Sequence, residues 1–394
     1  MMIKRKRMLG ALLMLSVTAI LIAGCSNNKK ENAKSDEKIK IGVLYSTTGD
    51  FSINETPMQN AAKMAIDEIN DDGGINGQKI EPIYMDYGSD PAIAADKAQE
   101  LILKDKVTAI VGTNASSTRL AVIPTIEQYD SLLVYNTYYE GETPSPNVMY
   151  TNSVPSQQIA DFIPWITENL GKKVYFVGSD YEFPRNSISY AKKLLEASGG
   201  EVVGEEYTPT NATDFSSVIN KIKKAEPDVV FSAVAGNSNV PFYKAYTQYG
   251  MDPKTTPICS VSTSEGTVKG IGEAAVGTYS SFDYFNTLDT EASKKFVSKY
   301  AELFGTDTTV TNQTEAAYHG VYFLAKALEK TKSLKTSDII DAFSGIEIDA
   351  PSGKIKMDDE NHHAWLNSYI AKVNEDQQFE IVYSSDKLVE PEVD

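Results

Sequence analysis

The three histidines are the first residues to consider for catalysis or metal binding. His319 lies in an apolar helical pattern that includes Val321, which is typical of a packed histidine and not of a catalytic base. His362 and His363 are adjacent in an Asp- and Asn-rich turn, and no partner at zinc-site spacing accompanies them, so a metal site there is the weaker alternative. The glycines of GIGEAAVG have the wrong spacing for a dinucleotide loop. We therefore predict no enzyme activity, no metal site and no cofactor.

Hydrogen-bonding side chains follow one of the predicted strands. In AIVGTNASSTRLAV, Asn114 and Ser116 stand between an apolar strand and a helix, with Thr113 and Ser117 beside them. The free N–H groups and the dipole at a helix start favour a carbonyl or carboxylate oxygen. Helix capping by Ser116 or Ser117, which contributes about 1 kcal/mol, is the alternative role, and one serine can cap while the other faces a cleft.

Tyrosines accumulate where another apolar strand ends. In LLVYNTYYEGETPSPNVMY, which begins at Leu132, the strand runs into Tyr135, Thr137 and Tyr138 and then into a proline-containing loop. Aromatic packing under that loop is one interpretation. Tyrosines also form rigid, flat walls with a hydrogen-bonding tip, which suits a cleft for a ligand of few heavy atoms.

Comparable side chains occur at strand ends in the second half of the chain. They are Tyr181 and Phe183 in VGSDYEFPRNS, Asn237 in AVAGNSNVPFY, and Thr263 with Glu265 in CSVSTSEG. Phenols, amides and hydroxyls that converge at strand ends are typical of a binding cleft.

Repeated strand–helix units must position these side chains. Apolar strands are predicted at 38–46, 79–88, 107–112 and from 132, and in a second series at 173–180, 201–209, 228–236, 257–263 and 277–285. The first helix is predicted from Pro57, where apolar residues begin to recur at helical spacing. Continuous apolar strands that alternate with helices indicate parallel sheets covered on both faces, with ligands beyond the carboxyl ends of the strands. We therefore predict an α/β fold of two doubly wound lobes.

The N-terminus has the pattern of a secretion signal. Four basic residues precede an apolar run from Met8 to Ala23, and LIAGC resembles a bacterial lipobox, in which Cys25 is acylated. An ordinary signal peptide with a chance cysteine is the alternative. We predict a lipoprotein signal peptide at 1–24, a flexible tether at 25–37 and an extracytoplasmic protein anchored to the cell membrane by lipid.

Charge and cysteine usage narrow the range of partners. The 394 residues carry a net charge of −17; residues 1–24 contain four basic residues and no acids, so the 370 residues that remain carry −21. A protein of such negative charge is not expected to bind nucleic acid, or to bind anionic lipid by electrostatic attraction. With Cys25 committed to lipid, Cys259 has no disulfide partner and is predicted to be a core residue.

The region from about Lys38 to Ser385 resembles the type I periplasmic solute-binding proteins. It is most similar to the urea and short-chain amide branch of the branched-chain amino-acid-binding family, which supplies ABC importers. The segments that carry the resemblance include AIDEINDDGGINGQKIEP, YYEGETPSPNVMYTNSVPSQQ, VGSDYEFPRNS, TNQTEAAYHGVY and IDAPSGKIKMDDENHHAW. The family's fold implies two lobes joined by a multi-crossing hinge, with lobe 1 at 38–153 plus 285–356 and lobe 2 at 154–284 plus 357–394.

The resemblance also implies which residues hold the ligand. The first-lobe set is Asn114, Ser116, Tyr135, Thr137 and Tyr138. The second-lobe set is Tyr181, Phe183, Asn237 and Thr263. Asn114 stands where related amide and urea proteins commonly have an aromatic residue, so the sequence departs from the family inside the pocket itself.

The predicted function is a substrate-binding lipoprotein of an ABC importer, partnered by a permease and its ATPases, that binds urea or a short-chain amide. A neutral planar amide needs only an oxygen site at the Ser116 helix start and oxygens that accept its N–H groups. The alternative is an amino acid, with Ser116 and Thr137 for its carboxylate and Glu140 or Glu265 for its ammonium group. A guanidinium-like cation as ligand, and a surface sensory receptor as role, are further alternatives.

Overall fold

The computed structural model describes residues 38–306 and 309–393. The predicted signal peptide, the lipidated Cys25 and the tether lie outside the described residues. Among the described residues, no helix has both the length and the apolar character that crossing a membrane requires.

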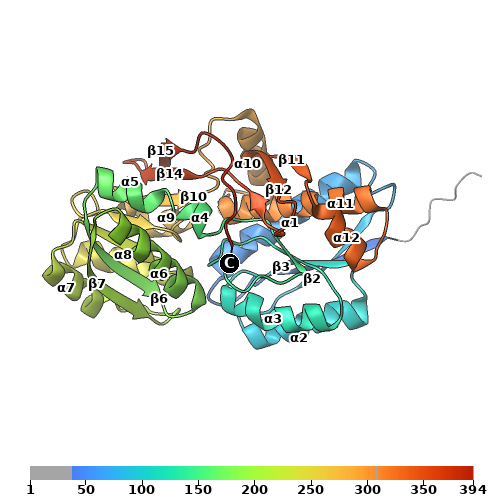
Figure 1. Ribbon diagram of the computed structural model, residues 1–394, viewed down its shortest axis with the longest axis horizontal. Coiled ribbons are helices and arrows are strands. Elements are labelled where there is room, and N and C mark those ends of the chain that lie inside the picture. The colour runs from blue at the N-terminus through green and yellow to red at the C-terminus, as the bar shows by residue number, and fades with distance from the viewer. Residues whose placement is uncertain (1–37, 307–308, 394) are drawn as a thin grey trace, which may run out of the picture. The chain divides into compact units, whose positions relative to one another are not determined.

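A five-stranded parallel sheet with the strand order β2-β1-β3-β4-β5 organises the first part of the fold (Figure 1). Helices α1 (Ser52–Asp71) and α11 (Asn312–Thr331) cover one face of this sheet, and α2 (Pro91–Glu100) and α3 (Ser116–Gln128) cover the other. Strands β1, β3, β4 and β5 are buried on both faces, as the continuous apolar runs predict, whereas β2 at the edge of the sheet is only partly buried. The strands are β1 (Ile39–Leu44), β2 (Ile80–Met85), β3 (Ala109–Gly112), β4 (Leu133–Tyr135) and β5 (Val148–Tyr150).

A seven-stranded sheet with the order β15-β14-β10-β9-β8-β6-β7 organises the second part. Strands β6 to β10 are parallel, and β14 and β15 extend the sheet in antiparallel pairs. The strands are β6 (Lys173–Ser179), β7 (Glu201–Thr208), β8 (Val229–Ala233), β9 (Ile258–Ser260), β10 (Tyr279–Phe282), β14 (Tyr369–Val373) and β15 (Phe379–Ser384). The helices are α4 (Pro155–Gln158), α5 (Phe162–Asn169), α6 (Glu182–Ala197), α7 (Ser216–Ala225), α8 (Asn239–Gln248) and α9 (Glu265–Ile271).

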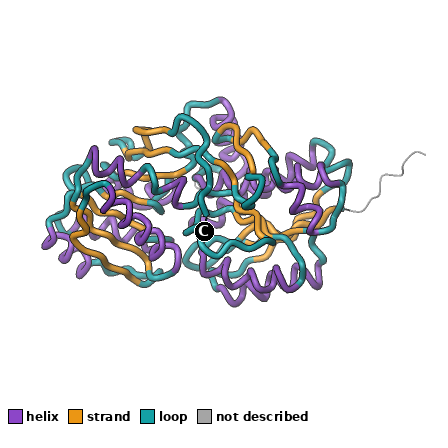
Figure 2. Tube along the Cα trace, in the orientation of Figure 1, coloured by secondary structure: helices purple, strands orange, loops and turns teal. Residues whose placement is uncertain are grey.

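A small antiparallel sheet and two further helices complete the described elements (Figure 2). The sheet has the order β11-β12-β13, and its residues pack in the same apolar cluster as α1 and α11. The remaining elements are α10 (Glu291–Phe304), α12 (Thr336–Phe343), β11 (Glu347–Ala350), β12 (Gly353–Met357), β13 (Ala364–Trp365), the π-helical turn Leu101–Asp105 and the 3-10 turns Gly236–Ser238 and Gly272–Ala275.

The chain passes between the two large sheets three times. It leaves the first sheet after β5, returns after β10, and passes again to the second sheet between β13 and β14. Ala364 and Leu366 still pack with the first sheet's cluster, beyond the predicted boundary between residues 356 and 357. The α/β fold with two mainly parallel sheets is confirmed, whereas the residue boundaries of the two lobes stay a prediction.

Two local predictions were wrong. Helix α1 begins at Ser52 and not at Pro57; Pro57 lies inside the helix, where it removes one ladder hydrogen bond without ending the helix. Strand β5 was not predicted, because its three residues come directly after a segment with two prolines, which is typical of a loop.

Candidate functional site

A small cavity lies where the loops after the strands of both large sheets meet. Its volume is about 20 Å³, which is room for one or two water molecules. The first wall comes from the loops after β1, β3 and β4 and from the start of α11, and the second wall from the loops after β6, β8 and β9. The first wall is Phe51, Asn54, Asn114, Ala115, Ser116, Thr137, Tyr138 and Gln313, and the second wall is Tyr181, Phe183, Ala235, Gly236 and Ser262. Carboxyl ends of parallel strands are where α/β folds bind ligands.

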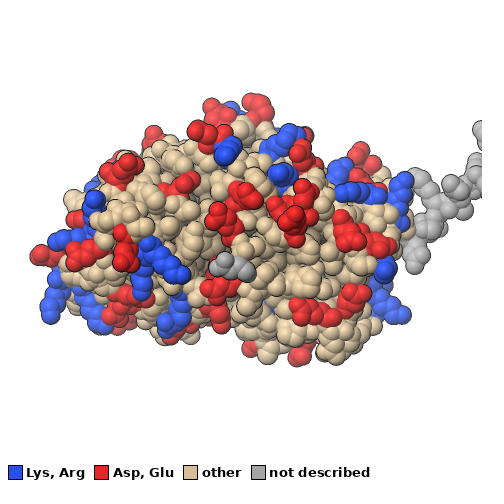
Figure 3. Space-filling view, in the orientation of Figure 1, with Lys and Arg blue, Asp and Glu red and all other residues tan. Residues whose placement is uncertain are grey.

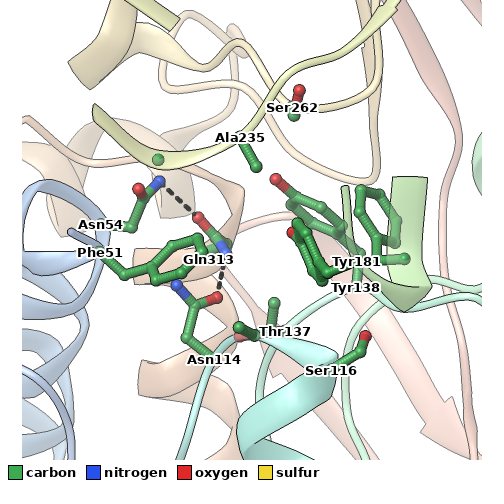
Figure 4. Close-up of a pocket in the computed structure, with 13 residues that line it drawn as sticks. Phe51, Asn54, Asn114, Ser116, Thr137, Tyr138, Tyr181, Ala235, Ser262 and Gln313 are labelled. Carbon is green, nitrogen blue, oxygen red and sulfur yellow. Dashed lines mark hydrogen bonds between the residues drawn. The ribbon is translucent and has the colours of Figure 1, made fainter. Parts of the chain in front are cut away.

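Three amide side chains of the first wall are joined by hydrogen bonds (Figure 4). Asn54 Nδ2 donates to Gln313 Oε1 at 2.9 Å, and Gln313 Nε2 donates to Asn114 Oδ1 at 2.9 Å. These bonds hold the amide groups in one orientation. Asn54 Oδ1 and Asn114 Nδ2 have no partner among the described residues, so one acceptor and one donor remain for a ligand.

Local backbone geometry positions Asn114. Gly112 has φ of +146°, and a Cβ at this position would lie 2.1 Å from the carbonyl oxygen of Leu44. Only glycine therefore allows β3 to end this close to β1. Thr113 follows with φ of +62°, and the hydroxyl of Tyr135 donates to the carbonyl of Asn114, which holds the loop from the other side.

The aromatic residues of the cavity contact one another across the two walls. The ring centroid of Tyr138 lies 5.2 Å from that of Phe183, and the ring of Phe51 meets that of Tyr181 edge-on at 6.3 Å. The backbone N–H of Asn237 also donates to the carbonyl of Asp50 at 3.2 Å, so the loops after β8 and β1 touch beside the cavity. Burial raises the pKa of the Tyr138 and Tyr181 phenols, which therefore stay neutral hydrogen-bonding groups at ordinary pH.

A buried ion pair stands behind Ser116. Arg119 Nη2 lies 2.6 Å from Glu140 Oε1, and the side chains are 0% and 2% exposed. Burial lowers the pKa of Arg119, but Tyr135 and Glu140 raise it by more, so the guanidinium stays charged. Glu140 is therefore neutralised by Arg119 and does not line the cavity, which argues against its predicted role as partner of a ligand ammonium group.

Six of the ten predicted binding residues line the cavity: Asn114, Ser116, Thr137, Tyr138, Tyr181 and Phe183. Thr137 is 4% exposed, and its Oγ1 is buried without a hydrogen-bond partner among the described residues. A buried hydroxyl of this kind costs free energy unless a ligand or water bonds to it.

The other four predicted binding residues do not line the cavity. Tyr135 is fully buried and holds the Asn114 carbonyl, and the Asn237 side chain is exposed. The Thr263 hydroxyl is fully buried beside the second sheet and is bonded to Asn239 and Ser260. Glu265 Oε1 accepts the backbone N–H of Asn286 at 2.8 Å, so this carboxylate serves a loop and not the cavity.

Sequence reasoning missed several lining residues. Phe51 and Asn54 follow the first strand, and that position at a strand's carboxyl end was a signal available in the sequence. Gln313 is far away in the chain and enters the first wall because α11, which Thr311 caps through the backbone N–H of Thr314, packs on the first sheet. No local pattern indicates such a long-range contact.

Two of the three histidines, His319 and His363, are packed side chains. His319 contacts Glu315 Oε2 through Nδ1 at 2.9 Å and the carbonyl of Thr151 through Nε2 at 2.7 Å; burial lowers its pKa, but these two acceptors raise it by more. His363 stacks on Tyr150 at 4.3 Å between ring centroids, and burial lowers its pKa to about 4. Among the described residues no cluster of metal-ligating side chains is present. Cys259 is buried in the second sheet, as predicted.

A wider groove of about 440 Å³ lies beside the C-terminal segment. Its lining includes Glu140, Glu142, Lys193, Glu390 and Glu392, so it is strongly charged. On the face drawn in Figure 3, acidic side chains lie around the C-terminal segment of the described chain. All thirteen residues of the small cavity are uncharged, and the two sites therefore suit different kinds of ligand.

Known proteins of similar sequence and structure define the family. The periplasmic binding protein domain matches residues 39–393. Leu/Ile/Val-binding protein homolog 6 of Brucella melitensis biotype 1 is 27% identical over 344 residues, which cover 85% of this chain and 87% of the relative. Homolog 7 of Brucella suis biovar 1 is 25% identical, with 88% of each chain covered.

Two solved structures are close in fold. A solute-binding protein of an ABC transporter from Rhodopseudomonas palustris BisB5, in complex with 3,4-dihydroxy benzoic acid, has a TM-score of 0.82 and 26% identity and covers 90% of this chain and 99% of its own. A leucine-binding protein from Thermotoga maritima MSB8 has a TM-score of 0.79 at 21% identity, with 88% of this chain and 98% of its own covered, and shows the fold alone. This chain therefore belongs to the periplasmic binding protein family and is an extracytoplasmic, non-enzymatic solute-binding protein of an ABC transporter.

Proposed function

We propose that the cavity binds a small neutral ligand, urea or a short aliphatic amide, for import. The observation that carries the proposal is the uncharged lining of a cavity of about 20 Å³, with joined amides on one wall and rings on both. A ligand of few heavy atoms gains little from buried area and must be held by hydrogen bonds and the exclusion of water. Asn54 Oδ1, Asn114 Nδ2 and the unpartnered Thr137 Oγ1 supply such bonds.

An amino-acid ligand needs a carboxylate from the protein for its ammonium group, because an unpaired buried charge is very costly. Glu140 is paired with Arg119, and one oxygen of Glu265 accepts the Asn286 N–H. A benzoate of the kind bound by the Rhodopseudomonas palustris protein would also have to displace rings that touch across the cavity. These features favour the neutral amide.

Isothermal calorimetry with a ligand panel tests this proposal. The panel contains urea, formamide, acetamide, guanidine, 4-hydroxybenzoate, leucine and the other common amino acids. We expect saturable binding of urea or an amide by the wild-type protein. Binding of an amino acid or of the benzoate, with no response to urea or amides, would contradict the proposal.

A matched pair of variants locates the binding site. Thr137→Val removes the unpartnered hydroxyl at nearly constant volume and should weaken binding about 3- to 10-fold. Thr255→Val removes a hydroxyl from an exposed turn, where Thr255 Oγ1 bonds to the Asp252 carbonyl, and should leave affinity unchanged. Equal effects of the two substitutions would argue against binding in the cavity.

We also propose that ligand binding draws the two walls together. The support is that Phe51 meets Tyr181, and Asp50 meets Asn237, only when the loops of both sheets are adjacent. X-ray scattering of the soluble body should give a smaller radius of gyration with urea or acetamide than without. An unchanged profile at saturation would contradict trapping by closure.

Lipid anchoring through Cys25 is a further part of the proposal. Its support is the basic leader, the apolar run and LIAGC in the sequence. In the native host, Cys25→Ala should release the protein from the membrane fraction. Unchanged membrane retention of that variant would contradict the anchor.

A further inference from the structure

The ion pair behind the first wall determines the charge state of Glu140. Arg119 and Glu140 are both buried, and their 2.6 Å contact makes each charge the principal compensation for the other. An ionised carboxylate has no proton to donate, so Glu140 can only accept hydrogen bonds. Arg119 lies 4.2 Å from the ring centroid of Tyr139, which further restricts its movement.

Ser116 is bonded to both members of this pair. Its hydroxyl donates to Glu140 Oε2 at 2.5 Å, and Arg119 Nη1 approaches Ser116 Oγ at 3.4 Å. A serine hydroxyl has one proton and two lone pairs. The proton is used by Glu140 and one lone pair by Arg119, so a single lone pair of Ser116 remains for the cavity that this residue lines.

We infer that the Arg119–Glu140 pair makes Ser116 a hydrogen-bond acceptor towards the ligand, so that the cavity selects a ligand N–H group at this position and rejects a carboxylate oxygen. The inference rests on the proposed function, in which the cavity is the ligand site. It is the opposite of the role that the amino-acid alternative gives Ser116, which is to serve a ligand carboxylate. Ser116 and Glu140 thereby distinguish an amide from the carboxylate of the same shape.

The start of α3 complements this acceptor. Its N-cap residue Ala115 offers no side-chain hydrogen bond to the first N–H groups of the helix. Those N–H groups favour an oxygen, whereas Ser116 Oγ favours an N–H group. An amide presents both an oxygen and N–H groups, and a carboxylate presents only oxygens.

Acetamide and acetate are matched probes because they differ little in shape. Calorimetry of the wild-type protein should detect acetamide and not acetate. Ser116→Ala should weaken acetamide binding about tenfold, and Ser116→Thr, which keeps the hydroxyl, should retain most of it. Unchanged acetamide affinity in Ser116→Ala would overturn the inference while leaving the proposed ligand class intact.

A double-mutant cycle tests the role of Glu140. In Glu140→Gln, an amide N–H can donate to Ser116 Oγ and release the serine proton towards the cavity, so the preference for acetamide over acetate should fall at least tenfold. The same substitution also leaves Arg119 without its counter-charge, which could attract acetate by itself. Comparison with Ser116→Ala/Glu140→Gln separates these effects, because the change in preference should disappear once the hydroxyl is absent.

Each outcome has a distinct meaning. An equal effect of Glu140→Gln in both backgrounds would overturn the inference, since the charge would then act without Ser116. Should Glu140→Gln fail to fold, Ser116→Ala and Ser116→Thr still decide the matter. Tighter binding of acetate than acetamide by the wild-type protein would overturn the inference. Binding of no amide and no urea, with a response only to the benzoate or to an amino acid, would overturn the proposed function and the inference together.

Discussion

The two walls of the cavity differ in how their side chains are held. In the first wall, Asn54, Gln313 and Asn114 are joined by hydrogen bonds, and the ion pair of Arg119 and Glu140 stands behind it. The second wall is made of rings, small residues and one serine. Hydrogen bonds between its lining side chains are absent among the described residues.

The acids behind the two walls differ as well. Glu140 is paired with Arg119, whereas Glu265, which follows β9, has one buried oxygen without a hydrogen-bond partner among the described residues. Burial raises the pKa of Glu265 to about 7. In the proposed function, the first wall is therefore organised before a ligand arrives and selects it, and the second wall completes the enclosure.

The largest expected effect comes from breaking the support of the first wall. Arg119→Met leaves Glu140 buried without a counter-charge and should lower the free energy of unfolding by about 3–5 kcal/mol. Differential scanning calorimetry measures the loss. In Arg119→Met/Glu140→Leu both charges are removed, and much of the stability should return; a double variant as unstable as the single one would contradict the ion-pair explanation.

The hydrogen-bonded side chains of Asn54, Gln313 and Asn114 are the next target. Gln313→Leu keeps a similar volume but leaves Asn54 Nδ2 and Asn114 Oδ1 without their common partner, so urea or acetamide binding should weaken by about 1–3 kcal/mol. Titration calorimetry measures the affinity. The control is Gln99→Leu on the exposed side of α2. A comparable loss of affinity in that variant would show that the effect of Gln313→Leu does not come from the three bonded amide side chains.

The unpaired acid behind the second wall predicts a pH dependence. Because folding raises the pKa of Glu265 from 4.5 to about 7, the folded state holds a proton that the unfolded state has lost, and this contribution to stability declines between about pH 5 and pH 8. Glu265→Gln removes that titration. Relative to wild type, the variant should therefore gain on the order of 2 kcal/mol from pH 5 to pH 8.

Thermal unfolding of both proteins at the two pH values measures this difference. Glu302→Gln, on the exposed side of α10, reports the effect of losing a surface carboxylate. A difference between wild type and Glu265→Gln that stays constant with pH would refute the assignment.

The smallest effect is expected from the rings of the second wall. Tyr181→Leu removes the edge-on contact with Phe51 and should weaken ligand binding by about 0.5–1.5 kcal/mol with little change in stability, because Tyr181 is only partly buried. Stopped-flow dissociation should be faster in this variant. Tyr249→Leu, at an exposed tyrosine after α8, is the matched control, and a large loss of stability in Tyr181→Leu would mean that the second wall is not merely an enclosure.

Part of the candidate site could be predicted from the sequence for a physical reason. Asn114 and Ser116 stand at a strand-to-helix junction, and the carboxyl ends of parallel strands converge, so their approximate location follows from local pattern alone. Gln313 could not be found in this way, because its contact with Asn114 depends on how α11 packs on the first sheet. Glu265 was misread for the same reason, since its partner Asn286 comes from a different loop.

The sequence by itself determined the alternation of strands and helices, the parallel sheets and the family. Apolar periodicity reports which residues are buried within each element, and this information is local. Only the tertiary structure decided which strand-end side chains face the cavity and which are used to hold loops, as Tyr135 and Thr263 are. Whether the Ser116 hydroxyl donates or accepts was decided in the same way, because it depends on the contact between Arg119 and Glu140 behind it. A hydrogen bond between residues distant in sequence exists only once the elements have packed.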